Sequence, residues 1–120
     1  MRDVKAANMA VRLIEETSRN LIQWKIGDVP STLTTGTGNY FSLFVETFFK
    51  DTRIALYEVK YRHFTDEDSF YWCETVVMAI LDQFDRVIWE SESDEPEIRE
   101  LYRLIRRSVG GVDRLLNYFR

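Results

Sequence analysis

The sequence predicts an α+β domain. An N-terminal helix comes first, then an antiparallel meander of about four strands, then a C-terminal helix and a short final helix. Three observations lead to this fold class. Residues 39–64 are the densest block of aromatic and β-branched residues in the chain, which favours strands. Both ends of the chain place apolar residues at steps of three and four, as one face of a helix does. Residues 93–97 carry a helix start signal between these regions.

The N-terminal helix is expected over residues 2–22. Its apolar residues form one stripe, so the helix can cover one face of a small sheet but not two. The stripe comprises Val4, Ala7, Val11, Ile14, Ser18 and Leu21, and it is broadened by Ala6, Ala10 and Leu13.

The segment after this helix predicts a short edge strand and a loop. Residues 21–26 lead out of the helix and can add the strand, and the composition of residues 27–39 is that of a loop. Gly36-Thr37-Gly38 looks like a fragment of a phosphate-binding loop. Such a loop needs a further glycine or a Gly-Lys-Ser/Thr, and a helix after it. An aromatic strand follows here, so the segment argues against nucleotide binding.

A β-hairpin is expected over residues 39–64. The strand Tyr40–Phe49 is apolar at both phases of the two-residue repeat, so both of its faces require burial. With Asp51-Thr52 as the loop, residue 48 lies opposite 55, and a slip of one residue would exchange the faces. One face then holds Tyr40, Phe44, Phe48, Ala55, Tyr57, Val59 and Tyr61, and the other holds Phe41, Leu43, Val45, Phe49, Ile54 and Leu56, followed by Glu58, Lys60 and Arg62.

Residues 63–69 predict an acidic loop. Asp66, Glu67 and Asp68 could chelate a hard cation. No glycine-turned calcium loop with a distal glutamate follows, so solvated loop charge is the favoured interpretation.

Residues 70–91 fit either one helix or two strands. A helix would be capped by Asp68 or Ser69. Two strands would run over 76–81 and 86–91, with a turn at 82–85. The β-branched and aromatic content favours strands, so a second hairpin is the prediction.

The C-terminal helix is expected to begin at Asp94, with Glu97 completing a capping box and Pro96 in the first turn. Gly110-Gly111 then breaks the helix, and a short final helix follows. The apolar face comprises Ile98, Leu101, Tyr102, Ile105 and Val109, and that of the final helix comprises Val112, Leu115, Leu116 and Phe119.

Charge is unevenly spread along the chain. Residues 64–97 hold eleven acids and one base, a local charge of −10, whereas residues 98–120 hold six arginines and two acids, a local charge of +4. The favoured interpretation is that the acidic segment attracts the basic helix within the chain. The alternative is an arginine surface for an acidic partner.

The sequence of residues 100–108 (ELYRLIRRS), followed by residues 112–116 (VDRLL), resembles the tail of small uncharacterised bacterial proteins. Those proteins consist of a helix, an antiparallel meander and a helix that carries the LY…RRS…VD..L motif. The chain also resembles proteins encoded on mobile genetic elements of the integron gene-cassette type. The resemblance implies a bacterial origin and no particular activity.

The residues that most catalytic and metal sites need are scarce. His63 and Cys73 are the only histidine and cysteine, whereas a structural zinc site takes about four such ligands. Cys73 lies among aromatic residues, where a cysteine is more often small core filler. No Gly-x-Ser-x-Gly or His-Glu-x-x-His motif occurs. The sequence therefore predicts no catalytic residue, metal or cofactor.

Length and composition are those of one globular domain over residues 1–120. No apolar run approaches the length of a membrane span, and the N-terminus lacks the apolar core of a secretory signal. A single cysteine excludes an internal disulfide and fits the reducing cytoplasm. A pI near 5.0 argues against nucleic acid as a partner.

Seventeen aromatic residues and a two-faced apolar strand predict more apolar surface than a monomer of 120 residues buries. The leading hypothesis is therefore a non-enzymatic module that forms a homodimer or homotetramer. The candidate oligomer interface is Phe41, Leu43, Val45, Phe49, Ile54 and Leu56.

Two alternatives to the oligomer stay open. One is a protein that binds a small apolar ligand in an aromatic pocket between sheet and helices. The candidate pocket is Glu46, Tyr57, Tyr61, Trp72 and Trp89. The other alternative, with weaker support, is a small enzyme that uses Glu46, Tyr57 or His63.

Overall fold

The computed structural model describes residues 2–119 and confirms the α+β fold class. The helices are α1 (Val4–Ser18), α2 (Ser31–Thr34), α3 (Pro96–Val109) and α4 (Val112–Tyr118). The strands are β1 (Lys25–Gly27), β2 (Tyr40–Phe49), β3 (Thr52–Phe64), β4 (Phe70–Leu81) and β5 (Val87–Glu90). The sheet has five strands rather than about four, because the short edge strand β1 joins it.

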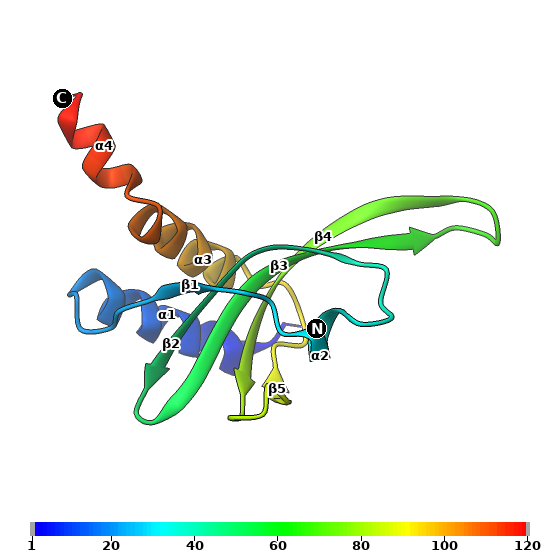
Figure 1. Ribbon diagram of the computed structural model, residues 1–120, viewed down its shortest axis with the longest axis horizontal. Helices are drawn as coiled ribbons and strands as arrows, with labels where there is room; N and C mark the ends of the chain where they lie inside the picture. The colour runs from blue at the N-terminus through cyan, green and yellow to red at the C-terminus, as the bar shows by residue number, and fades with distance from the viewer. Residues whose placement is uncertain (1, 120) are drawn as a thin grey trace.

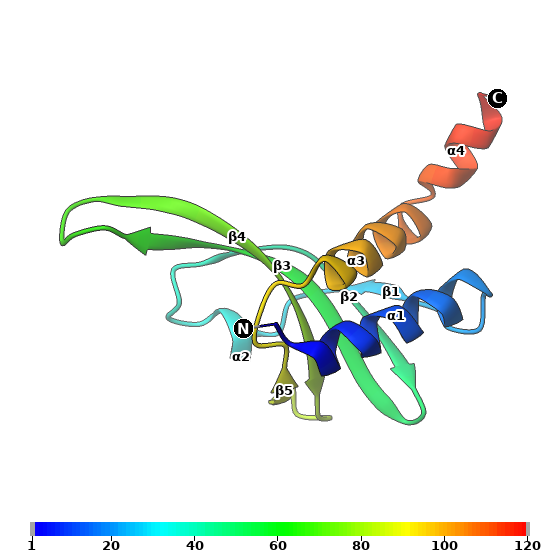
Figure 2. The same ribbon diagram turned by 180° about the vertical axis from the view of Figure 1, so that it is seen from behind.

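The sheet is a meander in which each strand pairs antiparallel with its neighbour in sequence, in the order β1-β2-β3-β4-β5. The helices α1 and α3 lie side by side on one face of it (Figures 1 and 2). The main core fills the space between this face and the two helices. Its largest fully buried side chains are Leu13, Val45, Leu56, Met78, Ile98, Leu101 and Ile105.

The opposite face of the sheet carries a second, smaller cluster around Phe44 and Tyr57. Their rings stack with centroids 5.9 Å apart. Among the apolar residues that the structure describes, Val29 and Leu33, from the segment that contains α2, are the ones that pack on this cluster from outside the sheet. This face is therefore thinly covered compared with the helix face.

The buried stripe of α1 differs from the predicted one. Ala6, Ala7, Ala10 and Leu13 are buried, whereas Val4, Val11 and Leu21 are exposed. Three of the four buried residues are alanines, whose small side chains let the helix pack closely against α3. The buried stripe is thus centred on Ala6, Ala10 and Leu13, which were predicted only to broaden it.

The first hairpin forms, but its turn lies one residue earlier than predicted. Lys50 and Asp51 are the loop residues, with φ of 51° and 62°, and Phe49 pairs with Thr52. Positive φ at both loop residues is the pattern of a type I′ turn, whose twist matches that of the flanking strands. Moving the loop by one residue shifts the pairing by two, so most side chains keep the face predicted for them.

An irregularity in β2 changes the face of two residues. The register of β2 on β3 shifts between Ser42 and Val45. Such a bulge reverses the alternation of the residues before it. Phe41 therefore packs with Phe44 and Tyr57, and Tyr40 moves to the helix face.

Residues 70–91 form a second hairpin, which confirms the prediction of two strands over the alternative of a helix. Its strand β4 begins at Phe70, earlier than the predicted residue 76. The turn between the strands is held by the Asp82 carboxylate, which accepts hydrogen bonds from the backbone N–H groups of Phe84 and Arg86.

The start of α3 differs from the predicted capping box. Glu95, not Asp94, is the N-cap residue, and its side chain does not cap the helix, although Pro96 does occupy the first turn. The Asp94 carboxylate instead binds the Arg99 guanidinium. Glu95 is buried and joins α3 to the beginning of the chain, because its carboxylate accepts hydrogen bonds from the Asp3 backbone N–H (2.6 Å) and Arg2 Nε (3.1 Å).

Candidate functional site

The six residues predicted as an oligomer interface lie mostly inside the chain's own core. Val45, Ile54 and Leu56 are buried beneath α1 and α3. The half-buried side chains of Leu43 and Phe49 pack against the same cluster. Phe41 is half-buried on the opposite face. The helices of the same chain thus cover the sheet face that the sequence analysis predicted to contact a second copy.

The five residues of the alternative pocket do not converge on one cavity. Tyr57 is buried on the face of the sheet opposite the helices, Trp89 packs against the helix-side core, and Trp72 is about half exposed. Glu46 and Tyr61 line two separate hollows. Burial, helped by the nearby Glu90 carboxylate, raises the pKa of Tyr57 to about 12, so this hydroxyl stays protonated at neutral pH.

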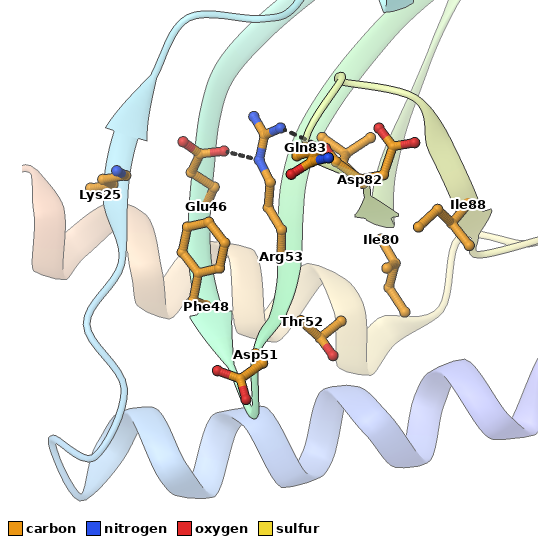
Figure 3. Close-up of a pocket in the computed structure, with 11 residues that line it drawn as sticks. Lys25, Glu46, Phe48, Asp51, Thr52, Arg53, Ile80, Asp82, Gln83 and Ile88 are labelled. Atoms are coloured by element: carbon orange, nitrogen blue, oxygen red, sulfur yellow. Dashed lines mark hydrogen bonds and ion pairs between the residues drawn. The ribbon is translucent and has the colours of Figure 1, made fainter.

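One open hollow of about 710 Å³ lies at the end of the sheet near the β2–β3 turn (Figure 3). Arg53 lies at its centre. Its Nε donates to Glu46 Oε2 (2.9 Å), and its Nη1 donates to the Asp82 carbonyl (3.2 Å) and to Asp85 Oδ1 (2.5 Å). These bonds tie the first hairpin to the turn of the second. Arg53 therefore has a structural role that occupies most of its donors.

The part of the β3–β4 hairpin beyond the other strands forms a projecting arm, residues 61–73. Figures 1 and 2 show it extending from the body of the domain. The first residue of β2, Tyr40, pairs with Lys60, so only β3 and β4 pair with each other along the arm. Neither α1 nor α3 reaches over it (Figure 2). The side chains of residues 62–72 are exposed on both faces, and only Tyr61 and Cys73 at the base of the arm are half-buried.

An aromatic patch covers the helix side of this arm. The pairing of Arg62 with Trp72 and of Phe64 with Phe70 continues the side of the sheet on which Leu56 meets the helices. The ring centroids of Phe70 and Trp72 are 5.7 Å apart. The arm patch comprises Tyr40, Phe64, Phe70 and Trp72, which are between 45% and 66% exposed. Arg62 stacks on the rings of Phe64 and Phe70.

The helix α4 carries a second bare apolar surface. Gly111, at φ +69°, turns the chain after α3, and α4 points away from the body (Figure 1). The α4 patch comprises Val112, Leu115, Leu116 and Phe119, which follow steps of three and four and are between 40% and 74% exposed. A helix whose apolar stripe faces water normally packs on another surface.

The two patches are flanked by opposite charges. The exposed acids Asp66, Glu67 and Asp68 form the tip of the arm. Exposed arginines lie on α3 and α4, among them Arg103, Arg106 and Arg114. The Asp66 carboxylate holds the tip by accepting from the backbone N–H groups of Asp68 and Ser69, so this acid has a structural role as well.

The chain matches no known protein family, no curated protein and no solved structure. The resemblance to small bacterial proteins of integron gene cassettes therefore stays a prediction. No helix within residues 2–119 has the length and apolar character to cross a membrane. The same residues contain no cluster of three or more His, Cys, Asp or Glu side chains placed to hold a metal ion.

Sequence reasoning missed the arm patch. It assigned Phe64 to the end of a strand, left Phe70 before the strand predicted over 76–81 and placed Trp72 in the candidate pocket, but it did not pair these residues across the acidic loop. The signal that could have found the patch is the symmetric placement of aromatic residues about the loop at 65–69. Residues at equal distances from a hairpin turn lie opposite each other and share one face.

Proposed function

We propose that this chain is a non-enzymatic interaction module that associates with itself, as a dimer or a tetramer. The observation that carries the proposal is the pair of bare apolar surfaces, the arm patch and the α4 patch. Both project from the domain, so they are placed to contact another molecule rather than the chain's own core.

The exposure of these patches supports association on energetic grounds. Burying a large apolar side chain fully contributes about 1.5–3 kcal/mol. The eight side chains of the two patches keep much of their surface in water in the single chain. A second copy that covers them would remove this surface from water, and a two-fold arrangement would do so twice.

The mass of the protein in solution tests this proposal. Light scattering on a size-exclusion column, at micromolar concentration, is expected to give at least twice the chain mass of 14.3 kDa. A mass that falls toward 14.3 kDa on dilution would agree with reversible association. A mass of one chain throughout the micromolar range would overturn the proposal.

A small-molecule site is the second candidate, and the hollow around Arg53 is the observation that favours it. Its lining combines charged groups with the exposed ring of Phe48 and the side chain of Ile88 (Figure 3). A library of small charged and apolar metabolites should then contain a compound that raises the melting temperature of the wild-type protein but not that of Phe48→Ala. No change with any compound would remove this candidate.

The compartment proposed for this module is the bacterial cytoplasm. Cys73 is a free cysteine in the structure, and an unpaired thiol fits a reducing compartment. Labelling of this half-buried thiol in intact cells, compared with labelling after lysis, tests the compartment.

A further inference from the structure

We infer that the α4 patch of one copy docks on the arm patch of a second copy, reciprocally about a two-fold axis. This inference rests on the proposed self-association and names the surfaces that carry it. The occupant of the arm is thus a helix from another copy of this chain.

The first argument is that the arm patch continues a surface that already binds helices. The inner face of β3 and β4 packs against α1 and α3 through Leu56 and Met78. Farther along the same strands this face has no helix over it and carries Phe64, Phe70 and Trp72 instead. A helix with an apolar stripe is the element that would extend the helix layer over this part, and α4 has such a stripe without a cover.

The second argument is charge complementarity. The arm ends in Asp66, Glu67 and Asp68, whereas Arg114 lies on α4 itself and Arg106 lies in the last turn of α3, next to it. Complementary charges around an apolar contact set the orientation of two partners. Contact between two arms would bring the acidic tips together or leave them unmatched. Contact between two α4 helices would do the same for the arginines.

The third argument is the placement of the two projections. In Figure 1 the arm extends to the right and α4 to the upper left. Figure 2 is the same molecule after a half-turn about the vertical axis, which is also the orientation of a two-fold partner. In Figure 2 α4 lies on the right, and in Figure 1 the arm lies on the right. A two-fold axis in this direction therefore brings each α4 to the side of the other copy's arm, and the contact closes after two copies.

Charge reversal tests the pairing of tip and helix. The tip variant is Glu67→Lys with Asp68→Lys, which leaves Asp66 to hold the turn. The helix variant is Arg106→Glu with Arg114→Glu. Each variant alone places like charges at both contacts, and its dimer dissociation constant is expected to rise about tenfold or more. Sedimentation over a range of concentrations measures this constant.

Mixing the two variants is the decisive step. In the mixed dimer, the reversed helix meets the reversed tip, and the native helix meets the native tip. Both contacts are attractive again, so the mixture is expected to dimerise within about threefold of the wild-type constant. A contact between two arms would leave the helix variant alone at the wild-type constant, and a contact between two α4 helices would leave the tip variant alone at that constant. Only docking of α4 on the arm predicts that both variants are weakened and that mixing restores both. Failure of the mixture to dimerise would overturn the inference.

The controls separate this inference from the proposed function. Lys5→Glu on α1, combined with Arg19→Glu at its C-cap, makes the same charge change and should leave the dissociation constant unchanged. A control that weakens the dimer as much as the helix variant would contradict the docking site. A wild-type chain that stays monomeric would overturn self-association itself. A wild-type dimer that ignores both reversals would overturn only the docking of α4 on the arm.

Removal of the apolar contact is an independent test. Leu115→Ala with Leu116→Ala keeps good helix formers in α4 while truncating its patch, and the dissociation constant should rise at least about tenfold. Val87→Ala with Ile88→Ala truncates exposed residues on β5 and should change it little. Equal effects of the two pairs would count against α4 as the docking element.

Discussion

The buried Glu95 carboxylate shows how much one polar side chain can organise in a small domain. It accepts hydrogen bonds from Ser93 Oγ (2.8 Å), the Asp3 backbone N–H (2.6 Å) and Arg2 Nε (3.1 Å). The Ser93 hydroxyl and the Asp3 N–H, followed by the Arg2 guanidinium, lower the pKa of Glu95 below its ordinary value of 4.5. The charged carboxylate thus fastens the beginning of the chain to the start of α3.

Glu95→Gln is expected to lower the melting temperature at pH 7. The pKa is lower in the folded chain than in the unfolded one, so the stabilisation is fully present above pH 4.5 and is lost as the pH falls through the folded-state pKa. The difference in melting temperature between wild type and Glu95→Gln should therefore shrink toward pH 3. Thermal unfolding followed by circular dichroism measures it. Glu100→Gln, at an exposed position of α3, is the control, and an equal effect there would rule out this role for Glu95.

Leu56→Ala should destabilise the domain by about 2–5 kcal/mol, because Leu56 is fully buried against the helices and its truncation leaves a cavity. Urea unfolding gives the free energy. Leu21→Ala, at a position that is 66% exposed, should cost less than about 0.5 kcal/mol. Similar losses at both positions would contradict the burial of Leu56 within one chain.

Composition predicted which side chains of the first hairpin are apolar, but not what covers them. Val45 and Leu56 look the same in the sequence whether a second copy or the chain's own helix lies over them. The choice depends on where α1 and α3 dock, and this is set by packing between residues far apart in the chain. The oligomer interface predicted from strand composition alone therefore consists mostly of residues of the chain's own core.

Among the elements, the turn of the first hairpin carries a conformational cost. Lys50 and Asp51 both adopt positive φ, a region in which side chains other than glycine are disfavoured. The type I′ geometry favours glycine at the second loop position. A wild-type sequence without this glycine leaves room for stabilisation.

Asp51→Gly should therefore raise the free energy of unfolding by about 0.5–1 kcal/mol, the typical gain when a residue that fits the turn better is introduced. Asp51→Val, a β-branched residue at φ 62°, should lower it by about 1–2 kcal/mol. Chemical denaturation of the two variants and the wild type measures the change in the free energy of unfolding for each variant. Equal effects of Gly and Val would show that φ at this position is not positive in solution.

Element types were predictable from the sequence where their patterns were strong. The loop at 65–69, the second hairpin and the helix after Pro96 all follow local chemistry. The bulge in β2 and the rotation of α1 did not follow from it. A bulge adds one residue without a sequence mark of its own, and the alanine stripe of α1 is buried for its small size rather than for its hydrophobicity.

On the scale of the whole molecule, the arm should behave differently from the rest of the sheet. Backbone amides of residues 61–73 have neighbours only within the hairpin, so they should exchange with solvent faster than those of residues 53–59. Hydrogen exchange measured at low and high protein concentration should show slower exchange in the arm and in α4 at high concentration. The central strands should show little change. Exchange in the arm that is independent of concentration would argue against an interface there.

The topology of the domain also has a consequence for how it folds. The sheet pairs only consecutive strands, so it can form hairpin by hairpin from local contacts. The helix layer joins the two ends of the chain, since the contact of Asp3 with Glu95 spans 92 positions, and this closure carries a larger entropic cost. We expect the transition state for folding to contain the sheet and the docking of α1 on α3 to follow it. Opening of the domain would then begin with the helices leaving the sheet. This opening would expose Val45, Ile54 and Leu56 on an otherwise formed sheet, and such an apolar surface aggregates readily.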